Sequence, residues 1–312
     1  MALNGIKRLK LSRIKSRKAS SDPVTVRFWG VRGSIPVPGV STARFGGNTS
    51  CVEFRCGSQR LILDAGTGIR GLGSALLLEQ PSGPLKVDLL LSHLHWDHIQ
   101  GLPFFQPIYQ AGHRLRIFGP SGPRLSLAEA FRLQMRSPLF PVDLRRLPSR
   151  PRFQKVSAGS FRIGRLKVDA IRVNHPDGCL GYRLSVAGLS VVYLPDCELA
   201  KRLSRRPRPA LADRELAAFI QGADLVIMDS QYDMSEYSRH VGWGHGCLED
   251  VVELACRAHV RKLALFHHDP DHDDRTIASR LRRARALARS RGSSMLIEAA
   301  QEGLTLSCSA AP

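Results

Sequence analysis

The chain has 312 residues, 43% of them hydrophobic, which is enough for a sizeable core in one large or two modest domains. It carries 46 Lys and Arg against 27 Asp and Glu, a strongly basic balance. No apolar run approaches the roughly 18 residues that a membrane span needs, and the N-terminus lacks the apolar stretch of a signal peptide. The seven cysteines contain no CxxC pair, as expected for thiols in a reducing compartment, so we expect a cytoplasmic protein.

The basic excess begins at the N-terminus. Residues 1–18 hold seven Lys or Arg side chains and no acidic one. Such a run is typical of a disordered, solvated tail, and it would also suit a nucleic-acid arm, an anionic lipid contact or an organelle presequence. We expect residues 1–22 to form this tail and residues 23–312 to form one folded domain.

Alternating and continuous apolar runs predict the elements of this domain in chain order. Strands are expected at 24–30, 49–56, 60–66, 84–93 and 114–120, with helices at 69–80 and 126–137. After an irregular, proline-rich segment at 137–160, strands are expected at 161–173, 179–186, 189–194, 224–229, 262–267 and 294–299, and helices near 211–221, 248–259 and 274–291. The early strands are expected to be mostly antiparallel. The runs DLLLSH and LVIMD are so apolar that both faces must be covered, as in two packed sheets with helices outside.

The stretch LLLSHLHWDHIQG, residues 89–101, is the strongest chemical signal in the chain. His93 and His95 are two residues apart at a strand end, so both side chains can point the same way. Asp97 and His98 follow after the chain turns and could face a second ion nearby. Imidazole nitrogens and carboxylate oxygens are zinc ligands. Four such side chains in six residues behind a buried strand therefore indicate a metal site rather than a polar surface run.

One linear segment rarely supplies a whole coordination shell, so further ligands are expected elsewhere. His175 follows VDAIRVN, Asp196 follows SVVYLP and His267 follows KLALF, each just past an apolar strand. Loops at strand ends are where ligand-bearing residues gather. The recurrence of metal-type residues at three equivalent places makes them candidate partners.

Together these segments resemble the metallo-β-lactamase superfamily, whose signature is HxHxDH followed by separate His, Asp and His ligands. The resemblance covers residues 24–300 and is greatest to the ribonuclease Z-like phosphodiesterases. The segments that carry it are GGNTSCVEF leading into LILDAGTG, the aspartate of VVYLPD, and GHGCLEDVVELACRAHVRKLALFHH. It implies a single-domain, four-layer αββα sandwich that acts as a metal-dependent hydrolase of phosphodiester bonds.

The resemblance also implies a role for each residue of the candidate site. It implies two zinc ions per chain, with manganese as the alternative: His93, His95 and His175 would hold the first, Asp97, His98 and His267 the second, and Asp196 would bridge them. His268 competes with His267, and spacing favours His267. Asp64, which closes LILD, would orient a ligand imidazole. A hydroxide between ions about 3.5–4 Å apart would be the nucleophile, with Asp97 accepting a proton and His245 serving the departing oxygen.

Other residues near the motifs are candidates for substrate contact or are expected to be structural. Arg32, in a Gly/Pro loop that would line the site, is a candidate contact for an anionic substrate. Trp96 and Trp243 are candidates for stacking on a base, with wall packing as the alternative. Cys197 follows the expected bridging aspartate and is interpreted as structural. The acidic residues of HHDPDHDD are expected to cap the helix at 274 rather than bind a further metal.

The chain has no room for the tRNA-gripping arm that ribonuclease Z enzymes carry between their third-motif histidine and bridging aspartate. Here His175 and Asp196 are separated only by PDGCLGYRLSVAGLSVVYLP, two short strands and a turn. We therefore favour a small phosphodiester substrate, first a 3′,5′-cyclic nucleotide. An RNA or DNA nuclease using the basic tail and Arg-rich surface, a carboxylic ester, lactone or thioester hydrolase, and a non-catalytic metal-binding protein stay open. The resemblance also suggests a homodimer.

Overall fold

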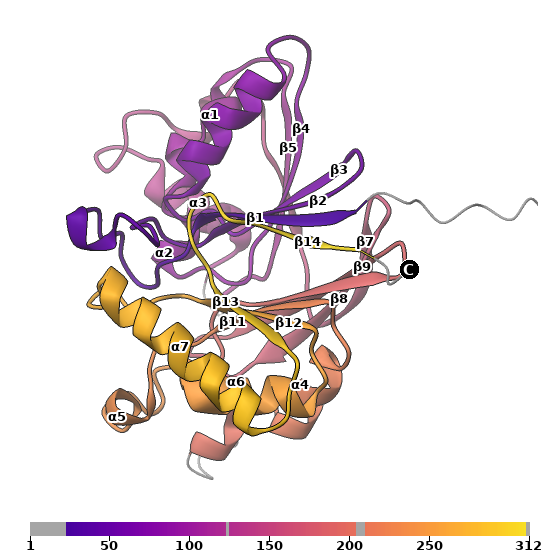
Figure 1. Ribbon diagram of the computed structural model, residues 1–312. Helices are drawn as coiled ribbons and strands as arrows, with labels where there is room; N and C mark the ends of the chain where they lie inside the picture. Colours follow the sequence, from indigo (N-terminus) through magenta and orange to yellow (C-terminus); the bar gives the residue numbers. More distant parts are fainter. Residues whose placement is uncertain (1–22, 123–124, 204–209, 310–312) are drawn as a thin grey trace, which may run out of the picture.

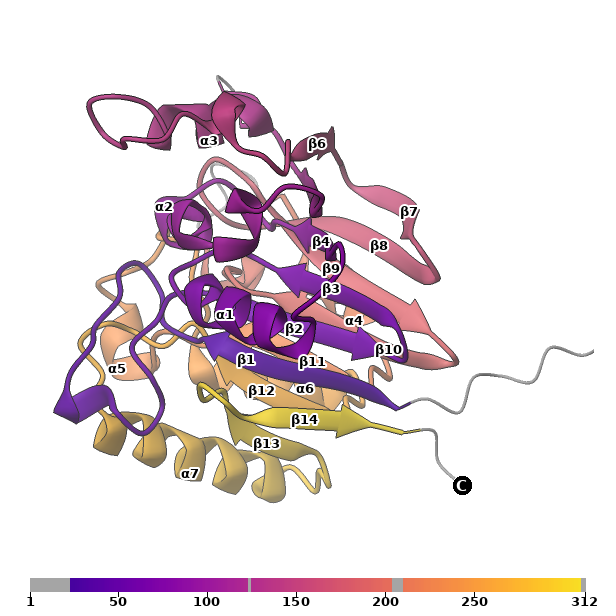
Figure 2. The same ribbon diagram turned by 90° about the horizontal axis from the view of Figure 1, so that it is seen from above.

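Two mixed β-sheets lie face to face with helices on both outer sides, as Figures 1 and 2 show. This computed structural model describes residues 23–122, 125–203 and 210–309. The expected αββα sandwich is confirmed. The basic tail predicted at 1–22 lies outside the described residues. Within the described part, no helix combines the length and apolar character that a membrane span requires.

The first sheet has the strand order β14-β1-β2-β3-β4-β5-β6. Its strands are β1 (Val24–Gly30), β2 (Cys51–Cys56), β3 (Gln59–Leu63), β4 (Lys86–Leu90), β5 (Arg114–Gly119), β6 (Arg152–Lys155) and β14 (Thr305–Cys308). β14, β1, β2 and β3 pair antiparallel, whereas β3 to β6 are parallel. α1 (Ile69–Glu79), α2 (Trp96–Ile99) and α3 (Leu127–Gln134) belong to this half of the molecule.

The second sheet has the order β13-β12-β11-β10-β9-β8-β7. Its strands are β7 (Gly159–Ile163), β8 (Leu166–Val173), β9 (Cys179–Val186), β10 (Leu189–Leu194), β11 (Leu225–Asp229), β12 (Lys262–Phe266) and β13 (Leu296–Ala299). β7 to β10 form antiparallel hairpins, and β10 to β13 are parallel. α4 (Asp213–Ile220), α6 (Leu248–Arg257) and α7 (Asp274–Ser290) cover its outer face, and α5 (Met234–Tyr237) lies near one end of α7.

Apolar side chains fill the three spaces between the four layers. The central cluster joins the two sheets through large buried rings such as Phe28, Phe54 and Phe266. Separate clusters lie between the first sheet and its helices and between the second sheet and its helices. Every residue of β10 and β11 is buried, because these central strands have a sheet on one side and helices on the other, as their unbroken apolar sequence predicts.

Several elements differ from the sequence prediction. The single strand expected at 161–173 is a hairpin, β7 and β8, which turns at Gly164 with φ +58°. The segment at 137–160 contains β6, and β14 and the short helices α2 and α5 were not predicted. The early strands are less antiparallel than expected, because β3, β4, β5 and β6 are joined by crossovers long enough for parallel pairing.

The direction of the parallel strands determines at which end of the sandwich a functional site can form. In α/β sheets, ligands bind beyond the carboxyl ends of the parallel strands. Asp64 follows β3, His93 lies just past β4, Asp196 lies just past β10, Asp229 ends β11, and His267 follows β12. Both sheets therefore contribute polar side chains at the same end of the sandwich.

The close approach of Gly30, at the end of β1, to Thr49, two residues before β2, gives a test of this packing. A Cβ atom on Gly30 would lie 1.8 Å from the carbonyl oxygen of Thr49, where the register of β1 and β2 shifts. Because the obstacle is backbone, Gly30→Ala should lower the free energy of unfolding by about 1–3 kcal/mol. Gly71→Ala is the control: its Cβ would lie 3.5 Å from Trp29 on the exposed side of α1, where alanine favours the helix by up to about 1 kcal/mol. Urea denaturation of both variants compares them, and equal stabilities would contradict the packing described here.

Candidate metal centre

Seven His and Asp side chains converge at the end of the sandwich where strands of both sheets stop. One ligand atom from each of His93, His95, His175 and Asp196 lies within 4.8 Å of the others. Asp97, His98 and His267 form a second group that meets the same limit. All seven residues singled out from the sequence as metal ligands are thus brought together, although they come from four separate segments of the chain.

Asp196 lies between the two groups and turns one carboxylate oxygen to each. Its Oδ1 is 3.1 Å from His98 Nε2 and 3.4 Å from His267 Nε2. Its Oδ2 is 3.7 Å from His93 Nε2 and 3.6 Å from His175 Nε2. The side chain is almost fully buried. This is the geometry that a residue shared between two cation sites requires.

The buried polar atoms at the centre suit a divalent cation. Among the described residues, His93 Nε2, His98 Nε2 and Asp196 Oδ1 are buried and have no hydrogen-bond partner. Buried polar atoms left unpaired are costly and rare in folded proteins. Imidazole nitrogens and carboxylate oxygens that point at a common space fit a metal such as zinc.

The histidines on the first-sheet side are oriented by hydrogen bonds from their outer nitrogens. His98 Nδ1 lies 2.7 Å from Asp64 Oδ2, and His93 Nδ1 lies 2.9 Å from Ser92 Oγ. Asp64 also accepts from the Ser92 backbone N–H, the Ser92 hydroxyl and the Tyr193 hydroxyl, at 2.7–2.8 Å. Asp64 has φ +59°, an uncommon backbone conformation for a residue other than glycine. Its four contacts hold it there, and the carboxylate in turn directs the Nε2 of His98 towards the centre.

The histidines on the second-sheet side are oriented in the same way by different partners. His175 Nδ1 donates to the carbonyl oxygen of Gly244 at 3.0 Å, and His267 Nδ1 donates to Gln231 Oε1 at 2.9 Å. His267 has φ +58° and its ring leaves no room for a side chain on Gly33, whose Cβ would lie 2.4 Å from it. In both residues Nε2 is the nitrogen that faces the centre.

Burial and neighbouring charges determine the protonation of these groups. Burial holds the pKa of His93 and His95 below the usual value and lowers that of His175 to about 4, so these rings are neutral at pH 7. Neutral imidazole is the form that binds metal. Burial alone would raise the pKa of Asp196, but the surrounding histidines, His267 first, keep it well below its usual range. The carboxylate therefore stays ionised.

His245 stands beside the cluster and is held by an aspartate that the motifs did not reveal. Its Nδ1 lies 3.0 Å from Asp229 Oδ2 and 3.9 Å from Asp196 Oδ2. Its ring stacks on that of His267, with 5.1 Å between centroids. Burial alone would lower the pKa of His245, but the Asp229 carboxylate, followed by Asp196 and Asp97, raises it to about 9. The ring therefore carries a proton at pH 7.

Comparisons with known proteins identify the family and the fold of the chain. Residues 59–268 match the family described as the Beta-lactamase superfamily domain. The chain belongs to the metallo-β-lactamase superfamily. It is 27% identical over 240 residues to a ribonuclease BN of Salmonella gallinarum, and the match covers 64% of this chain and 76% of that relative.

Two solved structures share the fold of this superfamily member. The metallo-β-lactamase fold protein YhfI of Bacillus subtilis superposes with a TM-score of 0.67 at 20% identity, covering 92% of this chain and all of YhfI. Unliganded yeast PDE1 superposes with a TM-score of 0.64 at 15% identity, covering 91% of this chain and 99% of PDE1. At these identities the superpositions show the common fold.

Two residues considered for the site, Arg32 and His268, do not take part in it. Arg32 was expected to contact substrate, but it is fully buried, and its guanidinium donates to the carbonyl oxygens of Gly46, Asp269 and His272. It ties loops together beneath the surface, so a substrate contact through Arg32 is not supported. His268, the competitor of His267, donates from Nε2 to the carbonyl of Ala300 at 2.9 Å and lies outside the metal-type clusters.

The two tryptophans considered for stacking on a base are both exposed. Trp96 is 66% exposed and Trp243 is 58% exposed. The Trp243 ring packs edge-on against His240, which stacks on Tyr232 with 4.0 Å between centroids, and Tyr232 in turn packs against His245. Trp243 is therefore connected to His245 through a row of aromatic rings while its own ring remains open to solvent.

Two smaller interpretations hold. Cys197 is fully buried, and burial raises the pKa of its thiol well above the usual value, so it is not poised to act as a thiolate ligand. Asp273 caps α7 by accepting from the backbone N–H of Thr276 at 2.7 Å. The acidic run at 269–274 thus includes the helix cap that the sequence predicted.

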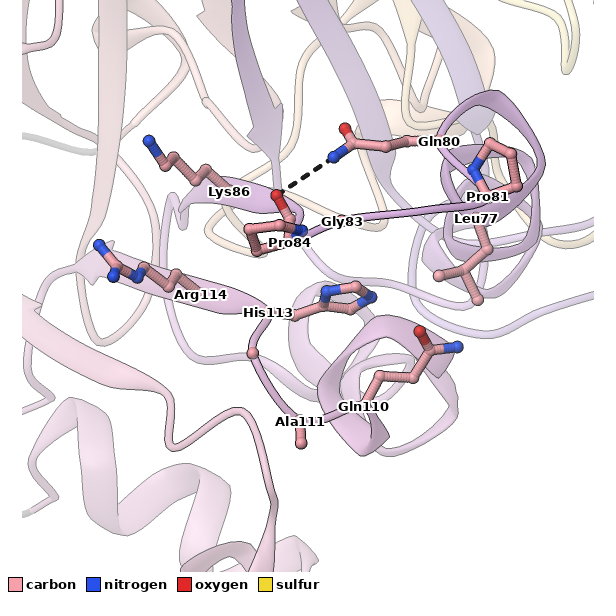
Figure 3. A pocket seen from close by; sticks show the side chains of 11 residues that line it. Leu77, Gln80, Pro81, Gly83, Pro84, Lys86, Gln110, Ala111, His113 and Arg114 are labelled. Carbon is pink, nitrogen blue, oxygen red and sulfur yellow. Dashed lines mark hydrogen bonds between the residues drawn. The ribbon is translucent and has the colours of Figure 1, made fainter.

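Two clefts differ in their relation to the centre. One of about 510 Å³ opens beside the cluster, with His93 and His95 on one wall and Leu94, Pro120 and Leu125 among the apolar lining. The other, of about 730 Å³, lies between the end of α1 and the starts of β4 and β5 (Figure 3). Its His113 accepts at Nδ1 from the Leu85 backbone N–H. Because the metal-type residues follow the opposite end of β4, this second cleft lies away from the centre.

The central position of Asp196 leads to a prediction about metal content. Asp196→Ala should lose most of the bound metal, because both sites would lose a shared ligand and the two cations would repel each other without the negative charge between them. Elemental analysis after dialysis measures the metal per chain. Asp177→Ala, on the rim of the adjacent cleft, is the control and should retain wild-type content. Unchanged metal in Asp196→Ala would contradict its shared role.

Proposed function

We propose that the protein is a binuclear metallohydrolase that cleaves phosphodiester bonds. The resident metals would be two zinc ions, with manganese as the alternative. The proposed ligands are His93, His95 and His175 for one ion, Asp97, His98 and His267 for the other, and Asp196 for both. When bound, the ions supply Lewis acidity towards a phosphoryl group and promote the ionisation of water.

The observation that carries this proposal is the orientation of Asp196. Each of its oxygens faces a different group of histidines, and its Oδ1 accepts no hydrogen bond. One cation would satisfy only one side of this carboxylate. A pair of sites is the arrangement used for displacement at phosphorus, because charge develops on both the attacking and the departing oxygen.

His245 and Asp97 are the groups placed to move protons. Asp229 holds the His245 ring at 3.0 Å and keeps it protonated, so His245 can donate to the departing oxygen. Burial alone would raise the pKa of Asp97, but His98 and His267 keep it well below its usual range, so it is a carboxylate that can accept a proton. The Ser34 backbone N–H donates to its Oδ2 at 2.9 Å and fixes its position.

A small substrate is favoured, first a 3′,5′-cyclic nucleotide. The chain between His175 and Asp196 forms only the β9–β10 hairpin, which leaves no insertion there to grip a large RNA. The cleft beside His93 and His95 has about 510 Å³, within the usual range for small-molecule sites. Its apolar wall suits a nucleoside, and the exposed Trp243 ring, which is linked to His245 through His240 and Tyr232, offers a stacking surface. A homodimer and a cytoplasmic location stay predictions.

A nuclease is the second candidate, and two observations favour it. The relative at 27% identity is a ribonuclease. The edge strands β6 and β7 and the segments around them carry exposed cations with no acidic partner among the described residues: Arg136, Arg150, Arg152, Lys155, Arg162 and Arg165. Such a surface fits a phosphate backbone, and RNA binding through it would weaken steeply as salt is raised.

The test is a hydrolysis screen on the metal-reconstituted protein. We expect metal-dependent cleavage of bis(p-nitrophenyl) phosphate and of cyclic nucleotides, with slower or no cleavage of short RNA. Faster cleavage of RNA, lost at high salt, would favour the nuclease. Cleavage of carboxylic esters or lactones alone, or metal uptake with no turnover, would contradict the phosphodiesterase proposal. A chain lacking residues 1–22 should cleave the small diester as well as the full chain does.

His245→Ala should lower turnover of the small diester by about 10²–10⁴-fold, because a positioned proton donor contributes that much. Its bound metal should be unchanged, since the Asp229 carboxylate keeps the His245 ring protonated and a protonated imidazole has no lone pair to offer a metal. Steady-state rates and elemental analysis are measured on the same preparation. An equal loss of metal and activity would make His245 a ligand instead, in the group that it forms with Asp196 and His267, whose ligand atoms lie within 4.8 Å of one another.

A further inference from the structure

The segment that carries His245 needs an anchor, because it has little structure of its own. Gly242 and Gly244 both adopt positive φ, +85° and +89°, and the segment lies between α5 and α6. Yet it must be held accurately. The Gly244 carbonyl accepts from His175, and a Cβ on Gly244 would lie 2.2 Å from His175 Nδ1. A small shift of this loop would therefore move both a candidate metal ligand and the proton donor.

Glu198 is the group that holds the loop. Its Oε1 accepts from the backbone N–H of Gly242 at 2.9 Å, and its Oε2 accepts from that of Gly244 at 2.8 Å. The hydroxyl of Tyr237 donates to Oε1 as well. The carboxylate is almost fully buried, and these three donors are all neutral groups. A buried carboxylate is costly to keep unless its hydrogen bonds are satisfied, so the site is built around this side chain.

The backbone of Glu198 is tied to another ligand-bearing segment. Its N–H donates to the carbonyl of Asn174 at 2.9 Å, and its carbonyl accepts from Asn174 Nδ2 at 3.0 Å. Asn174 directly precedes His175, and Glu198 itself lies two residues after Asp196. Glu198 thus joins three segments of the centre, which end in His175, Asp196 and His245.

We propose that Glu198 is a positioning residue for the metal centre. It fixes the loop at 242–245 so that the Gly244 carbonyl holds His175 with Nε2 towards the cluster and His245 stays against Asp229. It acts through the loop and touches neither metal nor substrate. The inference rests on the proposed function only for the reaction that the centre catalyses. The position of His175 can be measured on this chain whether or not it hydrolyses a phosphodiester.

Glu198→Gln tests the inference. The amide keeps one acceptor oxygen and replaces the other with an NH₂ group, so at least one of the three donors to Glu198 loses its acceptor and faces another donor. We expect zinc affinity, measured by chelator competition, to fall about 10–100-fold, as for other groups that orient ligands. The turnover number for a small diester should fall with little change in KM. In the metal-free protein, the downfield NMR signal of the His175 Nδ1 proton should shift or disappear.

Glu53→Gln is the matched control. Glu53 is as buried as Glu198 but lies on β2, where it accepts from Trp29 and Arg55. It should lose stability in urea while keeping zinc affinity and the His175 signal. If Glu198→Gln behaves like this control, Glu198 is merely structural and the inference is wrong.

Tyr237→Phe keeps the inference testable if Glu198→Gln does not fold. It removes one donor to the carboxylate and should weaken zinc binding several-fold, with the His175 signal shifted. A folded Tyr237→Phe with unchanged affinity and signal would overturn the inference. Absence of phosphodiester hydrolysis by the wild-type chain would instead sink the proposed function, and the comparison of zinc affinities and NMR signals would still decide the role of Glu198.

Discussion

The centre depends on one buried carboxylate. Asp196 lies among histidines from both halves of the sandwich, and each of its oxygens is within 3.7 Å of two imidazole nitrogens. Removing such a group from water is costly unless positive charge or hydrogen-bond donors surround it. The structure surrounds it with four imidazoles, and the Nε2 atoms of His93 and His98 have no hydrogen-bond partner. The stability of the ionised carboxylate and the capacity to hold cations therefore arise from the same arrangement.

The surrounding residues make this arrangement rigid. Ligand histidines at the ends of strands are free to rotate unless a second partner fixes the outer nitrogen. Asp64, Ser92, Gly244 and Gln231 perform this task with four different kinds of acceptor, a carboxylate, a hydroxyl, a backbone carbonyl and an amide. The two halves of the fold therefore orient their ligand histidines through separate sets of hydrogen-bond partners.

The half contributed by the second sheet depends more on loops. Gln231 is itself held, because its Nε2 donates to Asp269 at 2.9 Å. The backbone of the 242–245 loop is held by Glu198, and Arg32 joins the loops that contain Gly46, Asp269 and His272. Hydrogen bonds with buried charged side chains thus fix these glycine-containing loops, which lie outside the helices and strands.

The seven candidate ligands, and most strands and helices, could be predicted because their signals are local. HLHWDH concentrates ligand types in one segment, and apolar runs that end in His or Asp show where strands stop. Asp229 ends its strand as Asp64 follows its own, so the same signal could have identified it. The hairpin turn at Gly164 was missed because the apolar pattern continues through it. Arg32 was misplaced because a loop sequence does not reveal which side of the loop faces inward.

The sequence by itself determined the types of ligand, the strand ends that carry them and the superfamily. Only the tertiary structure decided that Asp196 divides its oxygens between two groups, that His245 rests on Asp229, and that Glu198 holds the loop between them. The physical reason is that each of these facts is a distance between segments remote in the chain. Composition and periodicity indicate which face of a helix or strand is buried. Which residues contact that face depends on how the elements pack in the folded chain.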